Sequence, residues 1–214
     1  MRQWKLILKI QSIEPQKRRK NRFTIILESG DVFGLSEDVF LSMPLKVGQK
    51  LDSKELEMIK SLELKTRIKD QAFILLSYRQ RSRSELSQRL KEKGHGQKVI
   101  ESLLDEFESK GYINDSDFAS MYATHLVEKK MTGKIAVRNK FYPHNIPDHI
   151  LNPIIEKLYL SNPPLDLVKS IIDKKMQMRK RTPKEKTRLV NLLKRKGFVW
   201  DEIEPAINNI DWNE

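Results

Sequence analysis

The segment Ser84-Glu-Leu-Ser-Gln-Arg-Leu-Lys-Glu-Lys-Gly94 carries a pattern that returns twice in the chain at nearly constant spacing. In each copy an apolar residue is followed four residues later by a second one, and four residues after that by Gly or Asn. The copies are 51 and then 52 residues apart, at Leu86, Leu90 and Gly94, at Val137, Phe141 and Asn145, and at Leu189, Leu193 and Gly197. Further apolar residues follow in the same register, at Ile100, Leu151 and Ile203 and at Phe107, Leu158 and Ile210. Repetition of this length predicts one helical unit used in tandem, rather than a globule around one pocket.

Helix start and stop signals divide each copy into three short helices. In the first copy, Ser82-Arg-Ser-Glu85 has the spacing of a capping box, and Gly94 and Gly111 stand where two helices end. The residue after a helix often takes a left-handed conformation, which costs other L-residues about 1–2 kcal/mol. Asn145 is the commonest substitute for glycine at such a position. One copy buries too little apolar surface to offset its own chain entropy, so packing between helices and copies has to supply the rest.

Caps and prolines predict the remaining boundaries. Asn114 caps the first helix of the second copy, and Thr182-Pro183 starts the second helix of the third copy. Pro143 should end the second helix of the second copy about a turn early. Pro153 and Pro205 share one register, and each removes a backbone donor. The third helices of these copies should therefore start late or bend there.

The first 50 residues have a different period. Apolar residues alternate with other residues from Trp4 through Leu6 and Leu8 to Ile10, and again from Phe23 to Leu27, which is the period of a half-buried strand. A basic hairpin loop separates the two, and Gly30 turns the chain into a short strand at Val32 and Phe33. Asp52 then begins a capping box and a connecting helix.

These patterns predict a mainly α-helical fold of tandem three-helix repeats in an elongated array, preceded by a small antiparallel β module. The expected boundaries are 1–50 for the β-sheet module, 51–65 for the connecting helix, 66–113 for repeat one, 114–160 for repeat two and 164–211 for repeat three.

Charge and composition restrict the function. The net charge of +12 favours polyanionic partners such as nucleic acid or an acidic protein surface. The chain has no cysteine, which excludes disulfides and thiolate metal sites and suits a reducing compartment. No apolar run approaches the roughly 20 residues that span a bilayer, and the amino terminus has no apolar signal core. We therefore expect a cytoplasmic protein without a membrane partner.

The sequence offers no candidate for catalysis. The four histidines do not have the spacing HExxH, and Gly94-His-Gly96 lacks the third glycine of a dinucleotide fingerprint. A nucleophile elbow and a phosphate-binding loop are also missing from the sequence. We expect no enzyme activity, no catalytic residues, no cofactor and no metal.

Basic residues cluster where the second helices of repeats one and three begin and run. Between Lys174 and Lys196, eleven basic residues face a single acidic one, Glu185. Such a strip is expected to bind phosphates or an acidic protein surface. The candidate residues are Arg79, Arg81, Arg83, Arg89, Lys91 and Lys93 in repeat one, and Lys174, Lys175, Arg179, Lys180, Arg181, Lys184, Lys186, Arg188, Lys194, Arg195 and Lys196 in repeat three.

The chain resembles the RecX family of RecA regulators over residues 66 to 211. The resemblance is carried by Leu76-Ser-Tyr-Arg-Gln-Arg-Ser-Arg-Ser-Glu-Leu86, by Gly111-Tyr-Ile-Asn-Asp115 and by Leu192-Leu-Lys-Arg-Lys-Gly-Phe198. It implies a curved array of three-helix repeats that binds the RecA filament on DNA and hinders its recombination and coprotease activities in DNA repair and the SOS response. Phe141-Tyr-Pro-His-Asn145 departs from the family pattern, which usually ends in Lys-Gly.

Several alternatives stay open at this stage. The basic strip has DNA, the RecA filament or both as possible partners, and any DNA is single-stranded or filament-bound and recognised with little sequence preference. A helix-turn-helix type regulator that reads duplex sequence is a second interpretation, and a helical scaffold without nucleic acid is a third. The sequence does not specify an oligomeric state.

Two variants separate residues of the core from residues of the surface. Leu86→Asp buries a charge at a core position, so it should unfold the repeats, with a loss of several kcal/mol, on the order of 4 or more. The double variant Arg179→Ala with Lys180→Ala should keep the fold and weaken binding. Circular dichroism checks the first result and a binding titration the second; normal binding by the double variant would place the interface elsewhere.

Overall fold

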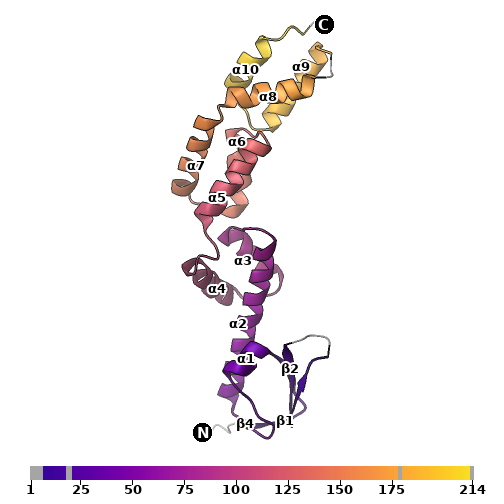
Figure 1. The fold of residues 1–214 in the computed structure, drawn as a ribbon, viewed down its shortest axis with the longest axis vertical. Coiled ribbons are helices and arrows are strands. Elements are labelled where there is room, and N and C mark those ends of the chain that lie inside the picture. Colours follow the sequence, from indigo (N-terminus) through magenta and orange to yellow (C-terminus); the bar gives the residue numbers. More distant parts are fainter. Residues whose placement is uncertain (1–6, 18–20, 178–179, 213–214) are drawn as a thin grey trace, which may run out of the picture. The chain divides into compact units, whose positions relative to one another are not determined.

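The computed structural model describes residues 7–17, 21–177 and 180–212 and shows a mainly helical chain that begins with a small antiparallel sheet, as predicted (Figure 1). The chain divides into two compact units. The first unit contains the residues up to Arg79 together with Arg89–Glu106, and the second contains Gln80–Gln88 and the chain from Phe107 onward. The division runs through α3 (Arg83–Glu92) and α4 (Gln97–Ser109). Repeat one therefore contributes residues to both units.

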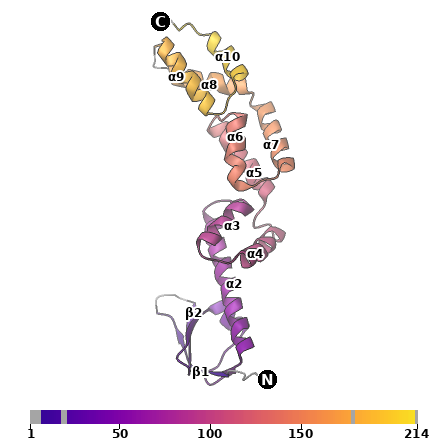
Figure 2. The ribbon, with the colours of Figure 1, turned by 180° about the vertical axis from the view of Figure 1, so that it is seen from behind.

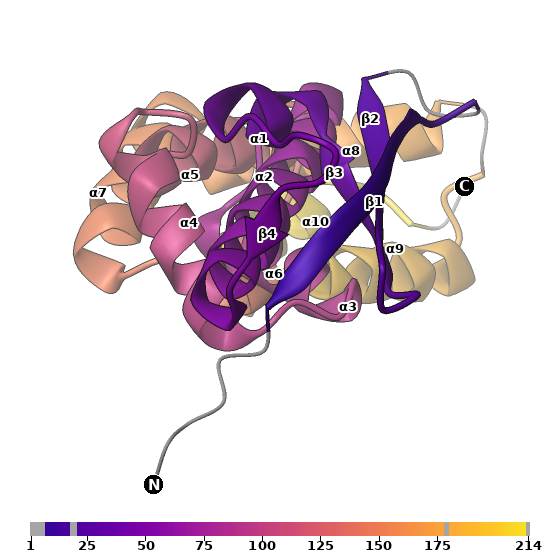
Figure 3. The same ribbon diagram turned by 90° about the horizontal axis from the view of Figure 1, so that it is seen from below.

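The amino-terminal sheet has four antiparallel strands in the order β3-β2-β1-β4 (Figure 3). Ile25 of β2 lies opposite Ile13 of β1 and Phe33 of β3. The predicted strands and the turn at Gly30 are confirmed, whereas Trp4 and Leu6 lie outside the described residues. The sequence patterns do not predict β4 or the short helix α1. The bounds are β1 (Leu8–Pro15), β2 (Arg22–Leu27), β3 (Val32–Ser36), α1 (Glu37–Ser42) and β4 (Lys50–Leu51).

One long helix, α2 (Ser53–Tyr78), covers the sheet and continues into repeat one. Its capping box is confirmed, because the Asp52 carboxylate accepts from the Glu55 backbone N–H at 2.9 Å and the Glu55 carboxylate accepts from the Asp52 N–H at 2.7 Å. The sequence predicts the connecting helix and the first helix of repeat one as separate helices. They are continuous because no glycine or proline lies between Ser53 and Tyr78.

Glu63 of α2 fastens this helix to the sheet. Its carboxylate pairs with the Arg22 guanidinium at 2.6 Å, and it accepts from the backbone N–H of Ser36 at 2.7 Å and from the Ser36 hydroxyl at 3.0 Å. The Glu63 side chain is only 13% exposed, so these bonds satisfy a largely buried charge. Ile59, one turn earlier, is buried in the core of the sheet.

Repeats two and three supply the rest of the second unit, in which α5 and α7 lie side by side (Figure 2). Repeat two contains α5 (Asp115–Thr124), the π-helical turn η1 (His125–Lys129), α6 (Lys134–Phe141), the 3-10 turn η2 (Tyr142–His144) and α7 (Asp148–Ser161). Repeat three contains α8 (Pro164–Met176), α9 (Pro183–Arg195) and α10 (Trp200–Asn208).

Several of the predicted helix caps and helix ends are confirmed. Asn114 caps α5, and α6 ends early as predicted, at Phe141, two residues short of the register position at which α3 and α9 end. Gly94, Gly111 and Gly197 have positive φ, and Asn145 does too, at 56°. The π-helical turn after α5 was not anticipated.

Neither Pro153 nor Pro205 delays the start of its helix, so that part of the prediction is wrong; the alternative, a bend at the proline, stays a prediction. Each proline is the sixth residue of its helix, because α7 begins at Asp148 and α10 at Trp200. A proline at this position removes only one intrahelical hydrogen bond, in the second turn. The buried residues of α7 and α10 hold the preceding turn in place, among them Leu151 in α7 and Ile203 in α10.

Repeats two and three share one hydrophobic core. The cluster joins Phe118 and Phe141 of repeat two to Leu189 and Ile203 of repeat three, and all four are at most 4% exposed. It also takes in Trp212, whose indole N–H donates to the Ile207 carbonyl at 3.0 Å. This shared core supplies the packing between copies that a single repeat lacks.

The two repeats meet where the end of α9 touches the start of α6. The Gly133 N–H donates to the Lys196 carbonyl at 2.8 Å. A Cβ at Gly133 would lie closer than 3.0 Å to the Gly197 carbonyl, and a Cβ at Gly197 would lie as close to the Ala136 backbone N. Gly133 occupies the cap position that Ser82 has in repeat one. Its side chain is absent because the Gly197 backbone fills that space.

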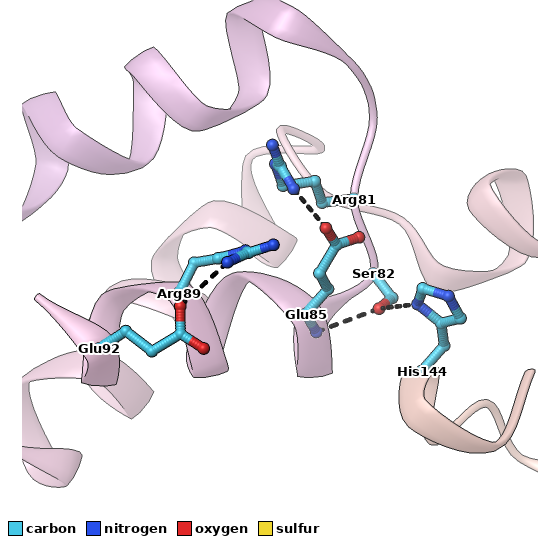
Figure 4. A network of polar contacts seen from close by, with 6 residues as sticks. All are labelled: Arg81, Ser82, Glu85, Arg89, Glu92 and His144. Atoms are coloured by element: carbon cyan, nitrogen blue, oxygen red, sulfur yellow. Dashed lines mark hydrogen bonds and ion pairs between the residues drawn. The ribbon is translucent and has the colours of Figure 1, made fainter.

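Repeat two makes a corresponding joint with the segment 80–88. His144 stands two residues after Tyr142, in the register of Lys196, and its Nδ1 lies 3.0 Å from the Ser82 hydroxyl (Figure 4). The same hydroxyl accepts from the Glu85 N–H at 3.1 Å. In both joints, the end of a second helix therefore contacts the start of the second helix one repeat earlier.

The glycine joint predicts an unequal response to two identical substitutions. Gly197→Ala adds left-handed strain and a clash with α6, so it should reduce the free energy of unfolding by about 2–5 kcal/mol. Gly94→Ala is the matched control, because Gly94 has the same φ of 87° but nothing within 4 Å of the added Cβ. It should cost only about 1–2 kcal/mol. Urea denaturation followed by circular dichroism measures both, and equal losses would contradict the joint.

Candidate nucleic-acid interface

The amphipathic helix α9 forms the most strongly basic surface of repeat three. Thr182 caps it by accepting from the Glu185 N–H at 3.3 Å, and Pro183 follows as its first residue. Leu189 and Leu193 are buried beneath the helix. Arg188, Asn191, Leu192 and Arg195 follow the spacing i, i+3, i+4 and i+7, which puts them on one other face.

This face lines an open groove of about 670 Å³. Lys175 of α8 contributes to one wall, and α9 and its end contribute the rest. The six lining residues include four cations and no carboxylate: Lys175, Arg188, Asn191, Leu192, Lys194 and Arg195. A groove with this charge and a neutral amide suits a phosphate-bearing chain.

An aromatic ring stands next to the groove. Trp200 is the first residue of α10 and is 44% exposed. The Lys194 ammonium, which also lines the groove, lies 5.7 Å from the centroid of the Trp200 ring. A cation therefore covers a half-exposed indole face at the end of the basic surface.

The predicted residues of repeat three are largely on the surface. Arg179 lies outside the described residues. Glu185 forms an ion pair with Arg188, so the one acid of this span already has a cationic partner. Lys186 is half-buried, and the exposed residues are Lys174, Lys175, Lys180, Arg181, Lys184, Arg188, Lys194 and Arg195.

Lys196 has a structural contact that the sequence did not suggest. Its ammonium donates to the Lys130 carbonyl at 2.5 Å and lies 3.4 Å from the Met131 carbonyl, at the end of η1. Burial, followed by repulsion from Lys175 and Lys130, lowers the pKa of Lys196. This lysine secures the joint between repeats two and three.

In repeat one, several predicted arginines contact acidic residues of the fold. Arg81 pairs with Glu85, and both side chains are mostly buried (Figure 4). The Arg83 guanidinium pairs with Glu108 at 2.8 Å, and its backbone N–H donates to Asp115 at 2.7 Å.

The other repeat-one candidates lie on the surface. Arg89 pairs with Glu92 at 3.0 Å (Figure 4). Arg79, Lys91 and Lys93 are exposed. Repeat three thus carries the larger accessible positive surface.

Repeat two replaces a basic position with an aromatic one. Tyr142 is in the register of Lys91 and Lys194 and is 87% exposed. His144, two residues later, packs against Phe118 with ring centroids 4.8 Å apart. This histidine is a packing residue of the joint and not part of the basic surface.

In the part of the chain that the structure describes, no group of three or more His, Cys, Asp or Glu side chains is placed to hold a metal ion. Over the same residues, no helix combines the length and the apolar character needed to cross a bilayer.

Three residues of the candidate interface and the neighbouring joint were not identified from the sequence. Asn191 is identifiable from its spacing to Arg188 and Arg195 on a helix. Trp200 follows a turn after α9, so the approach of Lys194 to its ring depends on tertiary structure. Gly133 has a signal in the sequence, because glycine stands where repeat one has a cap residue.

Comparison with known proteins gives a consistent result. The family model described as the first three-helix domain of RecX matches residues 69–107. The regulatory protein RecX of Bacillus subtilis is 29% identical over 207 residues, covering 95% of this chain and 77% of the relative. That of Clostridium tetani is 25% identical over 214 residues, covering 97% of each chain.

Two solved structures share the fold. A crystal structure of regulatory protein RecX aligns with a TM-score of 0.64 at 23% identity, over 94% of this chain and all of the other. The crystal structure of RecX from Lactobacillus salivarius aligns with a TM-score of 0.52 at 20% identity, over 67% of this chain and 94% of the other.

Two neighbouring lysines should respond differently to the same substitution. Lys196→Met removes a charge-assisted donor from two carbonyls, so the free energy of unfolding should fall by about 1.5–3 kcal/mol. Lys194→Met removes only a solvent-exposed cation–π contact and should cost at most about 1 kcal/mol. Thermal and urea unfolding of both variants provide the measurement, and a reversed order would show that Lys196 does not secure the joint.

Proposed function

We propose that this chain, which is similar to RecX proteins along nearly its whole length, is a nonenzymatic regulatory protein that binds the RecA–DNA filament and inhibits its recombinase and coprotease activities. The similarity to RecX proteins along nearly the whole chain supports this proposal. We further propose a cytoplasmic location, where such filaments form, and a role in DNA repair and recombination.

The basic groove of repeat three is the observation that carries the proposal. Its four cations lie on adjacent helices of one compact unit and are exposed, and no carboxylate lines the groove, although Glu185 pairs with Arg188 from beside it. A filament of DNA and protein presents phosphates at regular intervals, and cations of this kind bind them regardless of sequence. We propose DNA in the filament as the partner of this groove.

The proposed contacts explain why little sequence preference is expected. Lysine and arginine side chains that bind phosphates fix position and orientation on the nucleic acid, whereas discrimination between bases requires contacts to base edges. If the four groove cations bind a single strand, the logarithm of the binding constant should fall with the logarithm of salt concentration with a slope of about −3.

The test is RecA-catalysed ATP hydrolysis and strand exchange on single-stranded DNA. Added at stoichiometric ratio, the wild-type protein should inhibit both. A triple variant, Lys175→Gln with Arg188→Gln and Arg195→Gln, removes three phosphate-binding charges, so half-inhibition should need on the order of tenfold more protein or greater.

A matched control neutralises three exposed lysines of the first unit. The variant Lys46→Gln with Lys54→Gln and Lys60→Gln loses the same total charge outside the groove and should inhibit as the wild type does. If the wild-type protein has no effect on RecA, the proposed function is wrong. If both triple variants lose inhibition equally, the groove is not the surface that inhibits RecA.

A further inference from the structure

We infer that repeat three carries a binding site for single-stranded nucleic acid, in which the groove cations hold the phosphates and Trp200 stacks on a nucleobase. The inference rests on the proposed function and adds to it a named nucleic-acid form and a base-contacting residue. It concerns the second compact unit alone, because all of its residues lie in α8, α9 and α10.

The first step concerns the backbone of the strand. Lys175, Arg188 and Arg195 line an open groove of about 670 Å³, which gives an extended phosphate chain several cations along one path. Arg188 and Arg195 are two turns apart on the same face of α9, so they neutralise successive parts of the backbone. Glu185 pairs with Arg188 at one side and does not line the groove.

The second step concerns the ring of Trp200. Non-specific single-strand proteins combine a basic groove with aromatic side chains on which bases stack, because every base has a π face. Trp200 is 44% exposed, and Lys194 connects it to the groove by lying 5.7 Å from the ring centroid. A base binding here takes the place of the ammonium over the ring, and Lys194 is then free to pair with the adjacent phosphate.

The start of α10 holds this ring in a fixed position. The Val199 N–H donates to the Glu202 carboxylate at 3.0 Å, which closes the first turn of the helix. Ile203 and Ile207 anchor the same helix in the shared core with no measurable exposure. A stacking platform on an anchored helix loses little side-chain entropy when a base binds.

Single-stranded nucleic acid fits these residues better than a duplex or an acidic protein. A duplex keeps its base faces stacked on one another, so it leaves Trp200 without a partner. An acidic protein surface neutralises the groove cations and likewise makes no use of the indole face. Only an unpaired base next to a phosphate uses both features at once.

The experiment uses the full chain labelled with 5-fluorotryptophan and an unstructured oligodeoxythymidine, without RecA. Fluorine NMR reports the tryptophans separately, and Trp200→Phe assigns the resonance of Trp200. Addition of the oligonucleotide should shift the Trp200 resonance and leave that of Trp212, which is buried and bonded to Ile207, unchanged. An unchanged Trp200 resonance at saturating oligonucleotide would overturn the inference.

Variants distinguish stacking from charge. Trp200→Ala should weaken binding roughly 5- to 150-fold without changing the salt slope, because it removes stacking and no charge. Trp200→Phe should restore most of the affinity. Lys194→Gln should reduce the magnitude of the salt slope by about 0.7, as expected for one lost phosphate contact on a single strand.

Tyr112→Ala is the control for a lost exposed aromatic ring. Tyr112 is 48% exposed, close to the value for Trp200, but it follows α4 and does not lie on the helices α8, α9 and α10 that carry the proposed site, so its removal should leave affinity unchanged. Circular dichroism confirms that each variant is folded.

Competition experiments decide the class of partner. A single strand should displace the labelled oligonucleotide, whereas an equal concentration of duplex or of a polyglutamate peptide should not. Equal competition by duplex or by polyglutamate would refute a stacking site. These binding experiments contain no RecA, so a negative result refutes the stacking site but does not bear on the inhibition of RecA. Conversely, a protein that does not inhibit RecA can still show the shift of the Trp200 resonance.

Discussion

The contact between the backbones of Gly133 and Gly197 is the constraint on which the arrangement of repeats two and three depends. It requires two glycines in the same place, one that ends α9 with positive φ and one that begins α6 without a capping side chain. The Lys196 ammonium closes the same joint by binding carbonyls at the end of η1. Once this contact is made, the apolar faces of both repeats lie in one core, and helices too short to be stable alone support one another.

Because the second helices meet at such joints, the side chains near each helix end have two different roles. The residue just before the Gly or Asn points into the joint in repeats two and three, as His144 and Lys196 show. The residue two positions earlier lies on the surface in all three repeats, as Lys91, Tyr142 or Lys194. Basic residues that are close in the sequence therefore differ in role, since some contact the joint and others lie on the surface. Charge alone does not identify the proposed binding surface. The groove and Trp200 are built from residues that stay exposed after the joint forms.

Much of the fold is predictable from local signals, and less of the candidate site. The 51- and 52-residue spacing, the caps at Asp52 and Asn114 and the left-handed Asn145 are all visible in the sequence because each depends on a few neighbouring residues. The error at Pro153 and Pro205 has the opposite cause, since tertiary packing outweighs one lost hydrogen bond. The ion pairs of Arg81 and Arg83, the role of Lys196 and the approach of Lys194 to Trp200 all depend on residues brought together by folding. A charge count shows which segment is basic, but not which of its cations are already used.

A joint built from main-chain atoms places few demands on the amino-acid sequence. It requires small residues at two positions and a donor or packing group at a third, and it is indifferent to most other side chains. The two joints in this chain differ accordingly, because one uses the side chains of Ser82 and His144 where the other uses the backbones of Gly133 and Gly197. Duplicated segments joined in this way are free to diverge on their outer surfaces without losing their mutual fit. At one such outer position repeat two exposes Tyr142, whereas repeat three has Lys194, which lines the basic groove.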